Sequence, residues 1–119
     1  MTGLIMLAHG SRVEETCETC NRILQDVKRA VAFDHAETAF LQFAKPELGE
    51  VVDRLYNAGC REIVVFPFFL FKGHHVRKDI PAALARLSAQ YADLQIRVLD
   101  SIGYDPKLVD IIVSRVKGA

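Results

Sequence analysis

Two histidine-bearing turns carry the residue types of this sequence that are best suited to chemistry. The first turn, residues 9–12 (His-Gly-Ser-Arg), follows the apolar run 4–8, and the second, residues 72–75 (Lys-Gly-His-His), follows the apolar run 63–71. Neutral imidazole is a good ligand for divalent transition metals, and because it titrates at about pH 6.5 it also accepts protons. We therefore treat the two turns as parts of one candidate metal site.

Both apolar runs are typical of strands that are buried on two faces, as in a parallel sheet. Ligands of open parallel sheets bind just beyond the carboxyl ends of the strands, where both turns would lie. The rest of the chain continues this alternation. Strands are predicted at residues 3–8, 37–43, 62–70 and 95–99, and helices at residues 12–32, 46–58 and 79–91 and from Asp105-Pro106 onward.

Four such strand–helix units favour an α/β fold, a three-layer, flavodoxin-like domain with a four-stranded parallel sheet and helices on both faces. A strand order of 2-1-3-4 would place the first and third strands side by side, so that the His9 turn and the 73–75 loop open into one crevice. Asp79 is the predicted N-cap of the third helix. Apolar stripes predict the buried helix positions, namely Val13, Cys17, Cys20, Leu24, Val27, Val31, Ile80, Leu84, Leu87, Tyr91, Leu108, Val109, Ile112 and Val116.

The composition limits the class of protein. The 119 residues, half of them hydrophobic and a quarter charged, fit a single domain over residues 1–119. A formal net charge of zero argues against a general binder of nucleic acids or anionic membranes. Three cysteines without a secreted-framework spacing, and an N-terminus without signal-peptide features, predict a cytoplasmic protein.

Some residues have a structural interpretation that competes with a chemical one. Cys17 and Cys20 have the spacing of half a zinc or redox site, but their place on an apolar helical stripe favours core packing. His35 is expected in a polar turn at the surface. Gly10 and Gly73 are expected to allow close backbone approach or a positive φ angle in their turns.

The segment 7–12, Leu-Ala-His-Gly-Ser-Arg, resembles the opening motif of the class II chelatases of tetrapyrrole synthesis. Residues 66–81 resemble the second motif of that family, a strand followed by Gly-x-His-Val and then by Asp, an aliphatic residue and Pro. The resemblance covers essentially the whole chain, in the short form that works as a homodimer in this family. It implies insertion of a divalent metal, Co²⁺, Fe²⁺ or Ni²⁺, into sirohydrochlorin. No nucleotide-binding glycine motif is present, so ATP is not expected to drive the reaction.

The resemblance also implies roles for individual residues. His9 would be a metal ligand and the proton acceptor, and His75, rather than His74, the second metal ligand. Many relatives carry a glutamate at the position of Gln42, a departure that weighs against an acid–base role there. Contacts to the macrocycle would come from Lys45 and from Leu70, Phe71, Lys72, Gly73, His74 and His75, with Ser11, Arg12, Gln42 and Arg77 as further candidates.

Basic residues gather in the sequence around the two turns. Sirohydrochlorin is rich in carboxylates, and a protein without net charge needs a local basic rim to hold it. The candidates for that rim are Arg12, Lys45, Lys72, Arg77 and Lys78.

Two other functions use the same residues. A metal or tetrapyrrole carrier would bind in the same crevice without turnover, and its metallation would stop at one equivalent. Phosphoryl transfer through a His-Gly turn is a third possibility, but histidine phosphatases place Arg before the histidine, where this chain has Ala8.

Overall fold

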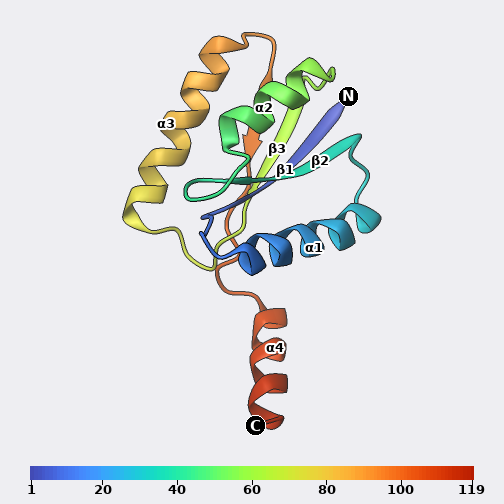
Figure 1. Ribbon diagram of the computed structural model, residues 1–119, viewed down its shortest axis with the longest axis vertical. Helices are drawn as coiled ribbons and strands as arrows, with labels where there is room; N and C mark the ends of the chain where they lie inside the picture. Colours follow the sequence, from blue (N-terminus) through green and yellow to red (C-terminus); the bar gives the residue numbers. More distant parts are fainter.

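The computed structural model describes residues 1–119, with the side chain of His75 as its one exception. Strands and helices alternate from end to end, as Figure 1 shows. The elements are β1 (Thr2–Ala8), α1 (Glu14–Ala30), β2 (His35–Phe40), α2 (Leu48–Asn57), β3 (Glu62–Pro67), α3 (His74–Gln90), β4 (Gln95–Val98) and α4 (Pro106–Lys117).

The four strands form one parallel sheet in the order β2-β1-β3-β4, which confirms the predicted order. Leu7 of β1 is paired with Ala39 of β2 on one side and with Pro67 of β3 on the other. The carboxyl ends of β1, β2 and β3 therefore meet at one edge of the sheet, and the segments after them start side by side.

Helices α2 and α3 cover one face of the sheet. Alternate residues of β1 and β3 point into this layer and are almost completely inaccessible to solvent, with Ile5, Leu7 and Val65 at 0% exposure and Ile63 at 1%. Because β-strand side chains alternate between faces, the residues between them point to the other side. There Met6 packs with Cys20 and Leu24 of α1, as well as with Phe40, in a smaller cluster.

Helix α3 begins five residues earlier than the sequence predicts. Gly73, not Asp79, is its N-cap residue, so His74 and His75 belong to the first helical turn rather than to a loop. The prediction was wrong because Asp79 followed closely by Pro81 is typical of a helix start. The apolar stripe through Ile80 extends back to the buried Val76, and this burial favours the earlier start.

Strands β2 and β3 are shorter than predicted. β2 ends at Phe40 instead of residue 43, and Phe43 has a positive φ angle of 61° that turns the chain away from the sheet. β3 ends at Pro67, which lacks the N–H that the ladder would need, so Leu70 and Phe71 lie in a connecting loop. His35, expected in a turn, is the first residue of β2 and is half-buried.

Helix α4 overturns the predicted burial of Leu108, Val109, Ile112 and Val116. Asp105 caps it as predicted, accepting a hydrogen bond from the Lys107 N–H, but none of its residues is buried. Figure 1 shows α4 extending away from the other elements. Val13 and Val31, which flank α1, are exposed as well. Cys20 of α1 is buried, and so is Cys60, which lies between α2 and β3.

Candidate active site at the carboxyl edge of the sheet

His9 lies directly after β1, at the edge where the strands end. Its imidazole ring rests against the ring of Phe69, with 4.3 Å between the centroids and 43° between the planes. The His9 carbonyl accepts a hydrogen bond from the Gln42 N–H at 3.0 Å, and the Ala8 carbonyl accepts one from the Leu41 N–H at 3.0 Å. The exposed imidazole is thus carried on a backbone that two consecutive hydrogen bonds join to the segment after β2.

Gly10 makes this arrangement possible. Its φ angle is +93°, and a Cβ atom built on it would lie 1.8 Å from the Gln42 carbonyl oxygen. No side chain fits there, so the expectation of close backbone approach is confirmed for Gly10. Gly73 differs, because its φ angle is −70° and a Cβ atom built on it would meet nothing within 4 Å. For Gly73 the prediction was wrong.

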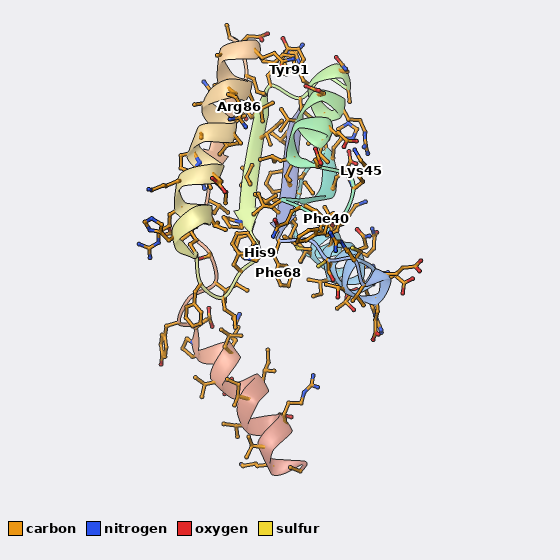
Figure 2. The ribbon with its side chains drawn as sticks, turned by 60° about the vertical axis from the view of Figure 1, so that its left-hand side comes forward. His9, Phe40, Lys45, Phe68, Arg86 and Tyr91 are labelled. Carbon is orange, nitrogen blue, oxygen red and sulfur yellow. The ribbon has the colours of Figure 1, made fainter. Side chains whose placement is uncertain are left out.

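A cleft of about 640 Å³ lies between α2 and α3 and opens at His9. This volume falls in the range of small-molecule sites, about 300–1,000 Å³. Figure 2 shows His9 and Phe40 at the same edge, with Arg86 further along α3. The described residues that line the cleft are His9, Phe40, Leu41, Gln42, Glu47, Leu48, Gly49, Gly73, His74, Val76, Asp79, Ala83 and Arg86.

One face of α3 forms a wall of this cleft. Val76, Asp79, Ala83 and Arg86 follow one another at steps of three and four residues, the spacing of a single helical stripe. Arg86 is the basic residue among the described lining, and the sequence analysis missed it. The stripe spacing would have revealed it once the helix was known to reach back to His74.

His9 and His74 line the same cleft, so the two sequence-distant turns do come together. The side chain of His75, predicted as the second metal ligand, lies outside the described residues, and its assignment stays a prediction. Among the described residues, no three histidine, cysteine, aspartate or glutamate side chains gather as a metal cage.

The predicted macrocycle contacts divide between two hollows. Gln42, Gly73 and His74 line the His9 cleft, whereas Leu70, Phe71, Lys72 and Arg77 line a second hollow of about 520 Å³ beside residues 100–103. Phe71 is 77% exposed and Leu70 48% exposed. The loop 68–73 therefore separates an imidazole side from an apolar and basic side.

The predicted basic rim is more dispersed than its sequence positions suggest. Lys45 forms an ion pair with Glu50, with 2.9 Å between Nζ and Oε1, and this hydrogen bond raises the pKa of Lys45 and lowers the pKa of Glu50. The guanidinium group of Arg12 stacks on Phe43, 4.6 Å from the ring centroid. Ser11 accepts a hydrogen bond from the Val13 N–H through its Oγ and so orders the start of α1.

Among the helices that the structure describes, none combines the length and the apolar composition needed to cross a bilayer.

Comparison with known proteins places this arrangement in a family. The sequence model of the CbiX family matches residues 3–119. A sirohydrochlorin cobaltochelatase of Saccharolobus islandicus is 30% identical over 98% of this chain and 94% of its own length. A sirohydrochlorin cobaltochelatase of Methanococcus aeolicus is 24% identical over 99% of both chains.

Solved structures agree with the sequence comparison. A CbiX protein of Marinobacter aquaeolei VT8, assigned to cobalamin (vitamin B12) biosynthesis, is 34% identical with a TM-score of 0.84, over 99% of this chain and 96% of that chain. The sirohydrochlorin chelatase SirB of Bacillus subtilis subspecies spizizenii, solved in complex with cobalt, is 26% identical with a TM-score of 0.91. That match covers 98% of this chain and 50% of the SirB chain. With its fold and nearly its whole sequence matched, this protein belongs to the CbiX family.

Proposed function

We propose that this protein inserts a divalent metal ion, Co²⁺, Fe²⁺ or Ni²⁺, into sirohydrochlorin. The observation that carries the proposal is the exposed His9 imidazole at the mouth of a cleft of about 640 Å³. The names of the matched relatives, two cobaltochelatases among them, support this reaction and put cobalt first among the metals to test.

The reaction requires two events at one place. Two pyrrole N–H protons must leave the macrocycle, and a partly desolvated cation must enter its centre. In the proposed mechanism His9 and His75 would bind the metal ion through imidazole nitrogens. As the ion passes to the ring, the His9 nitrogen that it leaves would accept one pyrrole proton, and the second proton would pass to solvent water. Two protein ligands leave coordination positions open, so the ion can pass to the ring rather than stay in a closed site.

The Phe69 ring supports the role of His9 through its position. It lies against one face of the imidazole and thereby limits how the ring can turn. An imidazole whose rotation is limited at the edge of the cleft loses less entropy when it meets the metal ion and the macrocycle.

Arg86 is a candidate for binding a carboxylate of the substrate. It lies 12 residues after His74 on α3, so the two are separated by about 18 Å along the helix axis. A macrocycle that reaches His9 with its centre can extend a peripheral carboxylate toward the far end of the cleft, where a guanidinium group forms a charge-assisted hydrogen bond. Lys45, Lys72 and Arg77 are further candidates around the rim.

The decisive experiment follows the absorbance change of sirohydrochlorin on addition of Co²⁺, without nucleotide and at substrate excess. The wild-type protein is expected to metallate many equivalents, and His9→Ala to lose at least about a hundredfold in rate, the range of a lost acid–base group. His35→Ala is the matched control, because His35 begins β2 at the opposite edge of the sheet. Metallation that stops at one equivalent would identify a carrier instead, and normal turnover of His9→Ala would refute the role of His9.

The proposal includes a homodimer, as the family resemblance implies, and a cytoplasmic location, as the cysteine usage predicts. Its quaternary structure and its metal preference are measured separately from turnover, by light scattering and by competition among Co²⁺, Fe²⁺ and Ni²⁺.

A further inference from the structure

Three sulfur-bearing side chains lie together between β1 and α1, on the face of the sheet opposite to α2 and α3. Cys17 and Cys20 are three residues apart on α1, so their Cβ atoms are separated by about 5–6 Å. Cys20 and Met6 of β1 are buried in the same small cluster, and Cys17 packs against it. One helix face and one strand thus gather two thiols and one thioether.

A buried hydroxyl group on the same face of the sheet is unpaired. Thr38 of β2 is paired with Met6 in the parallel ladder, so both side chains point to the face that α1 covers. The Thr38 side chain is 5% exposed, and its Oγ1 has no hydrogen-bond partner within the described chain. Leaving a buried hydroxyl unpaired is unfavourable, and a thiolate is an acceptor that would satisfy it.

The two thiols differ in their access to solvent. Cys17 is half-buried, and its Sγ lies 3.8 Å from the Ser11 carbonyl oxygen, to which it donates a weak hydrogen bond. Cys20 lies deeper, where burial and the neighbouring Cys17 thiol raise its pKa. An ion arriving from solvent would therefore meet Cys17 first, with Cys20 and Met6 behind it.

Core packing explains two of these observations and leaves one unexplained. Buried cysteine and methionine side chains commonly behave as hydrophobic residues, and both cysteines lie on the apolar stripe of α1. A purely apolar cluster, however, gives the Thr38 hydroxyl nothing to bind. The unpaired hydroxyl and the gathered sulfurs together indicate a site that is completed when a thiolate forms.

We propose that Cys17, Cys20 and Met6 bind one soft metal ion of the class of Cu⁺, at a site separate from His9. Thiolate and thioether ligands select Cu⁺, whereas Co²⁺, Fe²⁺ and Ni²⁺ are well served by imidazole. Zn²⁺ takes four ligands, and histidine, cysteine and carboxylate side chains do not form even a group of three in the part of the chain that the structure describes. This inference does not rest on the proposed function.

The binding reaction releases protons. Both thiols lose a proton to solvent water and bind as thiolates, while the Met6 thioether binds without losing one. With Cu⁺ the site then carries one negative charge. The Thr38 hydroxyl donates a hydrogen bond to a thiolate, and Cys17, the fourth residue of α1, lies near the positive end of the helix dipole. Both contacts favour the loaded site.

The test is an anaerobic titration of the full chain with Cu⁺, in competition with a chromophoric Cu⁺ chelator. The wild-type protein is expected to take up one equivalent and to show the ultraviolet absorbance of copper–thiolate bonds. Cys17→Ser and Cys20→Ser are expected to lose both signals. Cys60→Ser is the matched control, because Cys60 is buried in the other hydrophobic cluster. His9→Ala is expected to keep the ion.

Two nearly isosteric variants test the site if Cys20→Ser fails to fold. Met6→Leu keeps the apolar volume and removes the thioether, so Cu⁺ is expected to bind more weakly. Thr38→Val removes only the hydroxyl and is expected to weaken Cu⁺ binding about 10–100-fold, the range for a lost second-shell partner. The metal-free Thr38→Val protein should unfold at the same urea concentration as the wild type or at a higher one, because an unpaired hydroxyl has been removed.

Three outcomes would overturn the site. The first is a wild-type protein that binds no more Cu⁺ than Cys17→Ser. The second is an ion that is lost from His9→Ala and kept in Cys17→Ser, since it would then bind to imidazole. The third is unchanged Cu⁺ affinity in both Met6→Leu and Thr38→Val, because the thioether and the hydroxyl would then take no part in binding.

Discussion

The two faces of the sheet are built from alternate residues of the same strands, yet they differ in how completely they are covered. In β3, Ile63 and Val65 are closed off by α2 and α3, whereas Val64 and Phe66, their immediate neighbours, are only half-buried. Side chains alternate between the two faces along a strand, so strand geometry alone does not explain this difference in burial. The difference is made by the helices, since two pack on the first face and one covers only part of the second.

A cluster of polar contacts reinforces the covered face at the amino edge of the sheet. Tyr56 of α2 stacks on Tyr91 at the end of α3, with 4.1 Å between the ring centroids. The Tyr56 hydroxyl donates to Asp93 at 2.6 Å, Tyr91 donates to Asp53, and Arg61 pairs with Asp93 at 3.1 Å. One face of the sheet is thus covered by two helices that are joined by polar contacts, while α1 covers only part of the other face.

The largest effect is expected for a cavity on the covered face. Ile63→Ala removes a side chain that is 1% exposed, and such substitutions cost about 2–5 kcal/mol in the free energy of unfolding. Urea unfolding measures this cost. A loss below about 1 kcal/mol would show that the covered face is loosely packed and would remove the contrast between the faces.

The next prediction compares neighbours that differ only in the face they occupy. Val65→Ala is expected to cost roughly 1.5–3 kcal/mol in unfolding free energy, because the side chain is fully buried. Val64→Ala, on the half-covered face, is expected to cost less, because its side chain is only half-buried. Urea unfolding of both variants measures the difference, and equal costs would contradict the contrast between the two faces.

A third prediction concerns the cleft on the covered face. Arg86→Gln keeps the size of the side chain but removes its charge, so a carboxylate of the macrocycle loses a charge-assisted hydrogen bond. KM for sirohydrochlorin is expected to rise about tenfold with little change in kcat, as for binding energy shared by ground and transition states. Arg22→Gln on α1, under the other face, serves as the control. A fall in kcat without a change in KM would assign Arg86 another role.

The smallest effect is expected at the polar cluster. The hydrogen bond from Tyr56 holds the pKa of Asp93 below its ordinary value of 3.8. The folded state is therefore stabilised by this carboxylate above pH 3.8, and that stabilisation is lost as the pH falls toward the lower folded pKa. Asp93→Asn and Tyr56→Phe should both flatten the dependence of stability on acid below pH 5. Thermal melts at several pH values measure it, with Asp110→Asn on α4 as the control.

The fold could be predicted from the sequence wherever local patterns and burial agree. The apolar runs of β1 and β3 and the alternation of strands and helices were sufficient to predict the parallel sheet. Its strand order, which the structure confirms, followed from the flavodoxin-like pattern, because spacing alone does not fix it. The failed prediction of burial for α4 has a different cause. The apolar stripe of α4 predicts that the helix needs a partner surface, but a pattern within one chain does not say which molecule provides that surface.

The site was predictable in part for the same reason. His9 and His74 follow strands that end at one edge, so their approach to one cleft follows from topology. Arg86 was missed because it becomes a neighbour of the site only through the register of a long helix whose start was misplaced. Lys45 and Arg12 were foreseen as a free basic rim, but Glu50 and Phe43 engage them, and such contacts depend on tertiary packing.

The two glycines beside the histidines, Gly10 and Gly73, differ in whether they can be replaced. At Gly10 the backbone of residue 42 fills the space that any side chain would need, so a substitution there would displace the turn that carries His9. At Gly73 there is open space and an ordinary φ angle, and a serine could cap α3 in its place. Attempts to retune the metal preference of this protein should therefore begin at the start of α3.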